Sequence, residues 1–202
     1  MMQTNLFEEG LRPAPIVVDG LTHIQNYITQ AEEAQLIEVI DLQPWLHDLK
    51  RRVQHYGYKY DYKARMVTKE LTIGPLPDWI EAVGLKLFRD RLITQRPDQV
   101  IVNEYHPGQG ISAHIDCIPC FSGEIVSLSL GGSCCMDFSH AITGQKTSLL
   151  LQPRDLLIFS GPARNEWQHG IASRKSDKIN GHNISRMRRI SLTFRKVIIT
   201  DD

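Results

Sequence analysis

Between residues 99 and 199, short apolar runs alternate with turn residues at regular intervals. Eight of these runs fit strands: 100–105, 111–115, 125–130, 134–138, 148–151, 156–159, 169–172 and 190–199. Gly, Pro, Asn or Asp stands in the connections, as is typical of turns between strands. Many short strands at even spacing predict a jelly roll, in which two antiparallel sheets pack face to face.

The first half of the chain predicts helices. Two short runs at 16–18 and 21–28 are strand-like, but the capping-box pattern at Thr29–Glu32 then opens a helix that we expect to end near Asp41. A second helix is expected over about residues 78–92, behind two prolines. The apolar positions that share a face are Leu36, Ile37 and Ile40 in the first helix, and Ile80, Val83, Leu87 and Phe88 in the second.

These elements fit a single domain of the α+β class, mainly β. We predict a double-stranded β-helix (jelly roll) with N-terminal supporting helices over residues 16–199, after a tail at residues 1–15. Residues 16–98 would supply the helices and a substrate lid, and residues 99–199 the jelly-roll core. A length of 202 residues with 42% hydrophobic side chains is enough for one such domain with a buried core.

Charge is balanced overall but unevenly distributed. The formal net charge is zero, so total charge predicts no polyanionic partner. Residues 1–48 hold eight acids and one base, which gives −7, whereas residues 50–69 hold seven bases and one acid, which gives +6. A basic segment of this kind is compatible with a nucleic-acid face and equally with a solvated surface.

The four cysteines lie in two close pairs, Cys117 with Cys120 and Cys134 with Cys135. A zinc site at the first pair would need two more ligands, and only the second pair is available. The sequence shows no signal peptide and no apolar run near the ~20 residues of a membrane helix. We therefore expect a cytoplasmic monomer with free thiols and no membrane partner.

The stretch from Asn103 to Asp116 closes with a pattern of metal-binding residues. Side chains two residues apart on a strand point to the same face, so His114 and Asp116 can meet on one ion. His169, which lies 53 residues further on, is the best third ligand. Two histidines and one carboxylate form the facial triad of non-haem Fe(II) oxygenases, which leaves positions open for a cosubstrate and O₂. The alternative is one buried His–Asp hydrogen bond and an unrelated histidine.

Near the end of the chain, one face of a predicted strand is polar. Its members are Arg189, Ser191, Thr193 and Arg195, between apolar Ile190, Leu192 and Phe194. Two guanidinium groups inside a sandwich need anionic partners, because unpaired buried charge is costly. A dicarboxylate fits, since arginine binds carboxylates through two parallel hydrogen bonds.

Taken together, these motifs resemble those of the AlkB-type Fe(II)/2-oxoglutarate dioxygenases, over about residues 15–198. The resemblance implies iron bound by His114, Asp116 and His169, and 2-oxoglutarate bound by Asn103, Tyr105, Arg189, Ser191 and Arg195. It also implies oxidation of a C–H bond by O₂, coupled to conversion of 2-oxoglutarate to succinate and CO₂. Family members that repair bases often have Asn where this chain has Ser191, so the geometry at that position can differ.

The segment 51–65 is the expected substrate platform. Its candidate residues are Arg51, Arg52, Tyr56, Tyr58, Tyr60 and Tyr62. On an extended strand the four alternating tyrosines would share one face, where aromatic rings stack bases and nearby cations hold phosphates. The resemblance implies a lid here that holds an extruded nucleotide, and the alternative is that the tyrosines pack on the core. A second basic stretch, 173–189, is expected to be a mobile loop near the site.

The segment after Asp116 departs from the family pattern. Alkyl-base repair enzymes of the family use an acidic residue there to read the base edge, whereas here the nearest acid is Glu124. The runs 107–111, 124–130 and 136–138 are more similar to the AlkB-like domain of tRNA wobble-uridine hydroxylases. We therefore predict demethylation or hydroxylation of a nucleobase in DNA or in RNA such as tRNA. A protein or lipid substrate, and a non-enzymatic metal-binding adaptor, are the alternatives.

Overall fold

The computed structural model describes residues 17–47, 50–61, 64, 66–179 and 181–199. Its elements in chain order are β1 (Leu21–Ile24), α1 (Gln30–Asp41), β2 (Val53–Tyr56), the 3₁₀ helix η1 (Lys69–Leu71), α2 (Asp78–Arg89), β3 (Gln99–Tyr105), β4 (Ile111–His114), β5 (Phe121–Gly131), β6 (Cys134–His140), β7 (Lys146–Leu151), β8 (Leu156–Phe159), α3 (Gly161–Asn165), β9 (Trp167–Ile171), β10 (Ser176–Ile179), β11 (His182–Ser185) and β12 (Arg189–Val197).

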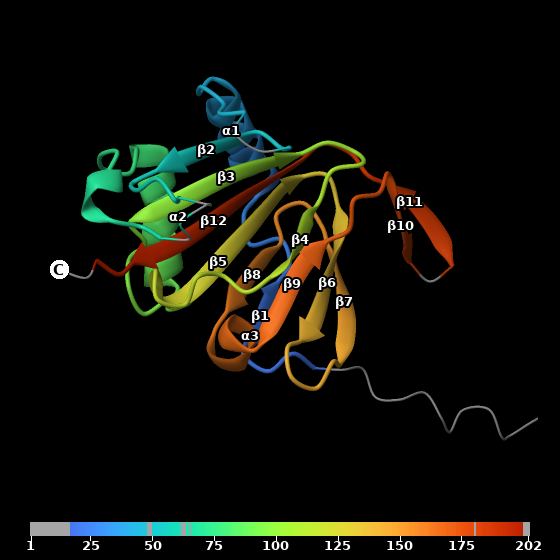
Figure 1. Cartoon of the computed structure of the whole chain (residues 1–202). Helices are drawn as coiled ribbons and strands as arrows, with labels where there is room; N and C mark the ends of the chain where they lie inside the picture. Colours follow the sequence, from blue (N-terminus) through green and yellow to red (C-terminus); the bar gives the residue numbers. More distant parts are fainter. Residues whose placement is uncertain (1–16, 48–49, 62–63, 65, 180, 200–202) are drawn as a thin grey trace, which may run out of the picture.

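Two antiparallel sheets form the body of the molecule (Figure 1). One has six strands in the order β1-β8-β5-β12-β3-β2, and the other has four in the order β4-β9-β6-β7. The pair β10–β11 forms a small third sheet that projects from the body at the right of Figure 1. The predicted jelly roll is confirmed, and each of its eight predicted strands is present with ends shifted by a few residues.

β12 is the central strand of the site, because it lies between β3 and β5. Its apolar residues Ile190, Leu192 and Phe194 are buried in the core cluster beneath the two long helices. The alternate residues, from Arg189 to Arg195, line a cavity between the two sheets. The alternation expected from the sequence is thus confirmed, since successive side chains of a strand point to opposite faces.

The helices α1 and α2 cover the outer face of the six-stranded sheet. The capping box of α1 is present: the Thr29 hydroxyl accepts from the Glu32 N–H at 3.2 Å, and the Glu32 carboxylate accepts from the Thr29 N–H at 2.7 Å. In α2, Leu87 is fully buried, whereas Phe88 is 43% exposed. The predicted apolar stripe of α2 was therefore one residue too wide.

The predicted strand-like runs near the N-terminus are shorter than expected. Val17 and Val18 lie outside any strand, and β1 covers only four residues of the run 21–28. The predicted tail at residues 1–15 and the side chain of Tyr62 lie outside the described residues. Within the described ranges, the helices are too short or too polar to cross a bilayer.

The expectation of an irregular loop at 173–189 was wrong, while its expected mobility stays a prediction. The stretch forms the hairpin β10–β11, and buried Asp177 ties it to the body. The Asp177 carboxylate accepts from Arg174 and Arg186, each at 2.7 Å, and from the Cys135 N–H at 3.2 Å. Burial alone would raise the pKa of Asp177, but these hydrogen bonds outweigh it and lower that pKa to about 2.

The expectation of four free thiols was also wrong. Cys117 and Cys120 form a disulfide, because the turn between them brings their Cα atoms to 5.3 Å, within the range that a disulfide spans. Cys134 and Cys135 are free thiols and buried.

The tyrosines of the expected substrate platform do not share one face. β2 ends at Tyr56 because Gly57 has a φ of 76°, and a Cβ there would lie 1.8 Å from a backbone carbonyl oxygen. The Tyr56 ring meets Trp79 edge-on at 5.4 Å, and burial raises the pKa of its hydroxyl to about 12. Tyr58 and Tyr60 pack instead against the apolar cluster between the sheets. Core packing, the alternative, therefore describes Tyr56, Tyr58 and Tyr60, although Tyr56 packs on a different core cluster from the other two.

Candidate active site

Three potential metal ligands converge at the edge of the four-stranded sheet. His114 is the last residue of β4 and the direct register partner of His169 in β9. Asp116 follows two residues beyond the end of β4, and not on the strand as the sequence suggested. One ligand atom from each of the three residues lies within 4.8 Å of the others. The structure thus brings together the three residues that the spacing singled out.

The close pairing of β4 with β9 depends on a glycine. A Cβ at Gly110 would lie 2.1 Å from the carbonyl oxygen of Ile171, nearer than any side chain can approach. Without that side chain, the two strands come close enough for the rings of His114 and His169 to lie 4.6 Å apart. The local sequence Gly–Gln–Gly before β4 therefore serves the geometry of the site.

The charge states of the triad suit metal binding. The Nδ1 atom of His114 lies 2.8 Å from the carbonyl oxygen of Ser112, so Nδ1 is the donor to that carbonyl and Nε2 is the atom available to a metal. Burial lowers the pKa of His169 to about 4, against the opposing influence of Asp116. Burial would raise the pKa of Asp116, but Arg195 and the two histidines lower it to about 2. Neutral imidazoles and an ionised carboxylate are the forms that bind metal ions.

The two oxygens of Asp116 face different partners. Oδ1 accepts from the Arg195 guanidinium at 2.6 Å, and Oδ2 lies 3.7 Å from Nε2 of His169. One oxygen is therefore fixed by a cation, while the other faces the histidines. A donor set of one carboxylate oxygen and two imidazoles fits Fe(II) with several coordination positions open.

Arg164 supports this segment from behind. The side chain is buried, and its guanidinium donates to the backbone carbonyl oxygens of Asp116, Cys117 and Phe121 at 3.0, 3.2 and 3.2 Å. It thereby fixes the turn between β4 and β5 that carries the carboxylate. No pattern in the sequence marks Arg164, because it acts on backbone groups that only the fold brings near.

A cavity of about 610 Å³ opens between the two sheets in front of the triad. Its polar lining includes Asn103, Tyr105, Ser127, Arg189, Ser191, Thr193 and Arg195 from the six-stranded sheet, and His114, Asp116 and His169 from the opposite side. All the residues predicted to bind iron or 2-oxoglutarate therefore line one space.

The two arginines of β12 have unused donors. Nη2 of Arg189 donates to the Ser129 hydroxyl at 2.9 Å, but its Nε is buried without a hydrogen-bond partner among the described residues. The Nε of Arg195 is in the same condition. Buried guanidinium N–H groups without partners are costly, and carboxylates satisfy them in pairs. A dicarboxylate therefore fits this wall of the cavity.

The hydroxyl groups beside these arginines complete the wall. Ser191 lies opposite both Asn103 and Ser129 in the sheet register, and its hydroxyl is 3.0 Å from that of Ser127. Burial raises the pKa of Tyr105, so its hydroxyl keeps its proton and can donate. Ser127 and Ser129 were missed in the sequence, although their alternation with apolar neighbours in β5 is a signal that could have found them.

A third guanidinium reaches the same end of the cavity. Nε of Arg51 donates to Oδ1 of Asn103 at 2.8 Å. The guanidinium carbons of Arg51 and Arg189 both lie 5.6 Å from the centre of the Tyr105 ring. Arg51 was predicted to bind substrate, but it lies among the residues predicted to bind 2-oxoglutarate.

Of the other residues predicted to bind substrate, some line the cavity and some do not. Tyr60 lines the cavity, with its ring centre 5.9 Å from that of Phe121. Arg52, Tyr56 and Tyr58 do not line it. Lys50, which was not singled out beyond its charge, does.

Comparison with known proteins places these features in a family context. The family model described as 2OG-Fe(II) oxygenase superfamily matches residues 20–195. The uncharacterized protein L905 of Acanthamoeba polyphaga mimivirus is 36% identical over 186 residues, which are 90% of this chain and 86% of that protein. The tRNA (carboxymethyluridine(34)-5-O)-methyltransferase ALKBH8 of Macaca fascicularis is 40% identical over 180 residues, which are 84% of this chain but only 26% of that protein.

Other similarities support the same fold. The alkylated DNA repair protein ALKBH8 homolog of Arabidopsis thaliana is 36% identical over 203 residues, and the match covers 59% of its length. The chain thus spans only part of the relatives that carry the ALKBH8 name. Among solved structures, OsALKBH1 superimposes with a TM-score of 0.64 at 17% identity, covering 92% of this chain and 99% of that one.

Proposed function

The chain belongs to the 2OG-Fe(II) oxygenase superfamily and is a dioxygenase that uses Fe(II), 2-oxoglutarate and O₂, and from this premise we propose that it oxidises a nucleobase in RNA or DNA. His114, Asp116 and His169 would hold the iron. The observation that carries this assignment is the convergence of the three ligand atoms beside two buried arginines with unused donors.

Different residues would bind the two ends of the cosubstrate. Arg195 is engaged with Asp116, so it orients the carboxylate ligand at the metal end. Arg189, six residues along β12, is free to bind the distal carboxylate of 2-oxoglutarate, with Asn103 and Tyr105 as neighbouring donors. Bound Fe(II) supplies the chemistry that couples decarboxylation of 2-oxoglutarate by O₂ to oxidation of a C–H bond. The protein residues orient both molecules and exclude water.

Two observations support a nucleobase as substrate. Lys50 and Tyr60 both line the cavity, and a cation and an aromatic ring on the walls of one cavity suit a phosphate and a stacked base. Several relatives are named for nucleic-acid substrates, among them the ALKBH8 proteins and a DNA N6-methyl adenine demethylase of Caenorhabditis elegans. Uridine in tRNA is the first candidate, because the relatives at 36–40% identity include those named for carboxymethyluridine in tRNA.

The position of Glu124 favours a substrate other than methyladenine. Its carboxylate accepts from the N–H and the hydroxyl of Thr94, each at 3.0 Å, and it does not line the cavity. No acid from this segment is therefore available to read a base edge, within the part of the chain that the structure describes.

A substrate panel tests the proposal. The protein with Fe(II), 2-oxoglutarate and O₂ is offered tRNA, methylated single-stranded DNA and a peptide mixture, and mass spectrometry measures the oxidised products against succinate formed. We expect an oxidised nucleoside in RNA or DNA with matching succinate. Tyr60→Ala should reduce this oxidation about tenfold or more, while Tyr58→Ala, outside the cavity, serves as the control. Oxidation confined to the peptide arm would overturn the proposal.

A further inference from the structure

Three pairs of adjacent residues, from separate parts of the chain, surround the Arg189 end of the cavity. They are Arg51–Arg52 before β2, Asn103–Glu104 in β3, and Arg188–Arg189 at the start of β12. Arg51, Asn103 and Arg189 line the cavity, whereas their chain neighbours do not. Adjacent side chains in extended chain point to opposite faces, so each cavity residue has a partner on the reverse side of the sheet.

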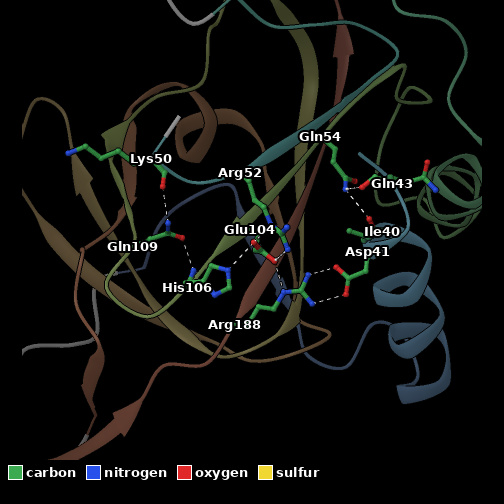
Figure 2. Close-up of polar contacts among 10 residues, drawn as sticks. All are labelled: Ile40, Asp41, Gln43, Lys50, Arg52, Gln54, Glu104, His106, Gln109 and Arg188. Carbon is green, nitrogen blue, oxygen red and sulfur yellow. Dashed lines mark hydrogen bonds and ion pairs between the residues drawn. The ribbon is translucent and has the colours of Figure 1, made fainter. Parts of the chain in front are cut away.

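The three reverse-side residues meet at one carboxylate (Figure 2). Glu104 is fully buried and accepts from Nε and Nη2 of Arg52, the latter at 2.8 Å, and from Nε of Arg188 at 2.5 Å. Burial would raise the pKa of Glu104, but the hydrogen bonds from both arginines outweigh it and lower that pKa to about 2. The carboxylate is therefore ionised and binds both guanidinium groups together. We call Arg52, Glu104 and Arg188 the Glu104 cluster.

Further contacts tie the cluster to surrounding elements. Arg188 also donates to the Asp41 carboxylate, at 2.9 Å for Nη1, which joins the cluster to the end of α1. The guanidinium of Arg52 lies over the Trp45 ring at 4.5 Å. His106 also contacts Glu104 (Figure 2), and its Nε2 lies 3.1 Å from Oε2 of that carboxylate.

The cluster lies where the backbone ladder stops. β2 begins at Val53 and β12 at Arg189, so Arg51, Arg52 and Arg188 all precede their strands. Two backbone bonds reach this far, from the Glu104 N–H to the Arg52 carbonyl oxygen at 3.1 Å and from the Gly132 N–H to the Arg188 carbonyl oxygen at 2.7 Å, and neither involves Arg51. Sheet hydrogen bonds therefore cannot by themselves fix the direction in which Arg51 projects.

We propose that Glu104 is a positioning residue for the 2-oxoglutarate end of the site. By holding Arg52 and Arg188 on the reverse face, it fixes the direction in which Arg51 enters the cavity beside Arg189, and its own strand neighbour Asn103 receives the Arg51 hydrogen bond at 2.8 Å. This inference rests on the proposed 2-oxoglutarate site. A purely structural ion cluster would stabilise the fold without affecting cosubstrate affinity.

The test is calorimetric titration of 2-oxoglutarate into protein loaded with Mn(II), which occupies the triad without turnover. Glu104→Gln should raise the Kd for 2-oxoglutarate about tenfold, the effect typical of residues that support a ligand's direct contacts. The Kd for Mn(II) itself should change less than about twofold, because no triad residue contacts the cluster. Asp177→Asn is the matched control: Asp177 is also a buried carboxylate between two arginines. The Asp177→Asn variant should lose about as much stability as Glu104→Gln and keep wild-type affinity for 2-oxoglutarate.

A double-mutant cycle sharpens the result. If Glu104 acts through Arg51, the effects of Glu104→Gln and Arg51→Ala on 2-oxoglutarate affinity should be less than additive. Should Glu104→Gln fail to fold, Arg52→Gln and Arg188→Gln, each of which leaves one guanidinium on Glu104, carry the same test and the same expectation.

The outcomes separate this inference from the proposed function. Wild-type affinity for 2-oxoglutarate in a folded Glu104→Gln protein would overturn the inference alone. An equal loss of Mn(II) and 2-oxoglutarate binding would also overturn it, because it would show a general loss of the site. Wild-type protein that binds Mn(II) but not 2-oxoglutarate would overturn the proposed clamp, and this inference with it.

Discussion

Glu104 stays ionised although its side chain has no exposure to solvent, because two guanidinium groups bind it. Its pKa in the folded protein is about 2, below the value of 4.5 for an unperturbed glutamate. A lowered pKa contributes stability that is complete above pH 4.5 and is lost as the pH falls toward 2. The contribution is up to about 3 kcal/mol. Asp116 and Asp177 act in the same direction.

The free energy of unfolding should therefore decrease as the pH falls from about 5 to about 2. In Glu104→Gln this decrease should be smaller, by up to about 3 kcal/mol, because the variant has no carboxylate to protonate at that position. Urea denaturation at several pH values measures both slopes. Parallel curves for wild type and variant would show that Glu104 has an ordinary pKa.

Arg164 should matter to the metal without touching it. Arg164→Leu leaves three backbone carbonyl oxygens without their donor, so we expect a loss of about 3 kcal/mol of stability. We also expect a Kd for Mn(II) raised about tenfold or more, because Asp116 loses its backbone support. Arg186→Leu is the control, since Arg186 is also buried and makes three hydrogen bonds, but in the hairpin. An equal loss of Mn(II) affinity in both variants would contradict the role of Arg164.

For single residues, the sequence predicts those functional side chains that regular spacing along a strand places on one face. The interval of two between His114 and Asp116, and the alternation in β12, indicate which side chains face the same way. Arg164 and Glu104 could not be found in this way. Their partners lie tens of residues away along the chain, and an arginine or glutamate that the fold buries has no local pattern to distinguish it from one at the surface.

At the scale of elements, the close approach of β4 and β9 is the feature on which the triad depends. In Gly110→Ala the new Cβ would lie 2.1 Å from a carbonyl oxygen of β9, so the strands must separate. We expect a loss of about 1–3 kcal/mol from this overpacking and a Kd for Mn(II) raised about tenfold, since the two histidines move apart. Isothermal titration and urea denaturation measure the two effects.

Gly144→Ala provides the comparison for that variant. Gly144 lies in the turn between β6 and β7 with a φ of 68°, and a Cβ there would meet no other atom within 4 Å. Alanine there should cost about 1–2 kcal/mol of backbone strain and leave Mn(II) affinity unchanged. If Gly110→Ala likewise kept wild-type affinity, the proposed dependence of the triad on strand spacing would be wrong.

Elements were predictable where local rules decide them. The capping box predicted the start of α1, and short apolar runs bounded by turn residues predicted the eight strands of the jelly roll. The hairpin β10–β11 escaped prediction because Asp177, which anchors it, accepts from the Cys135 N–H on the distant strand β6. The tyrosine segment misled because one glycine with positive φ turns the chain after β2, which alternation alone does not reveal.

At the scale of the whole molecule, the two sheets enclose a site whose ligands should stabilise the fold. The residues proposed to bind Mn(II) and 2-oxoglutarate come from β3, β4, β9, β12 and the turn after β4, so the folded protein alone brings them together. At about 100 times its Kd, 2-oxoglutarate should raise the free energy of unfolding of the Mn(II)-loaded protein by about 2.7 kcal/mol. In His169→Ala, the part of this stabilisation that depends on Mn(II) should disappear. Stabilisation of equal size in that variant would indicate binding elsewhere.

The architecture follows from the sequence better than the substrate does. Strand spacing, the capped helix and the arginine strand together predict a jelly roll with a dioxygenase site, because each rests on local periodicity. The substrate face depends on how the segment around Tyr60 folds over the cavity, and one turn at Gly57 redirects it. Of the predicted platform, only Arg51 and Tyr60 reach the cavity among the residues that the structure describes.

An anomalous difference map from crystals grown with Mn(II) and 2-oxoglutarate tests the assignment of the site most directly. It should show one metal peak coordinated by His114, Asp116 and His169, with the 2-oxo acid chelating it and the distal carboxylate on Arg189. A metal peak away from these three side chains, or 2-oxoglutarate bound without contact to Arg189, would contradict the assignment.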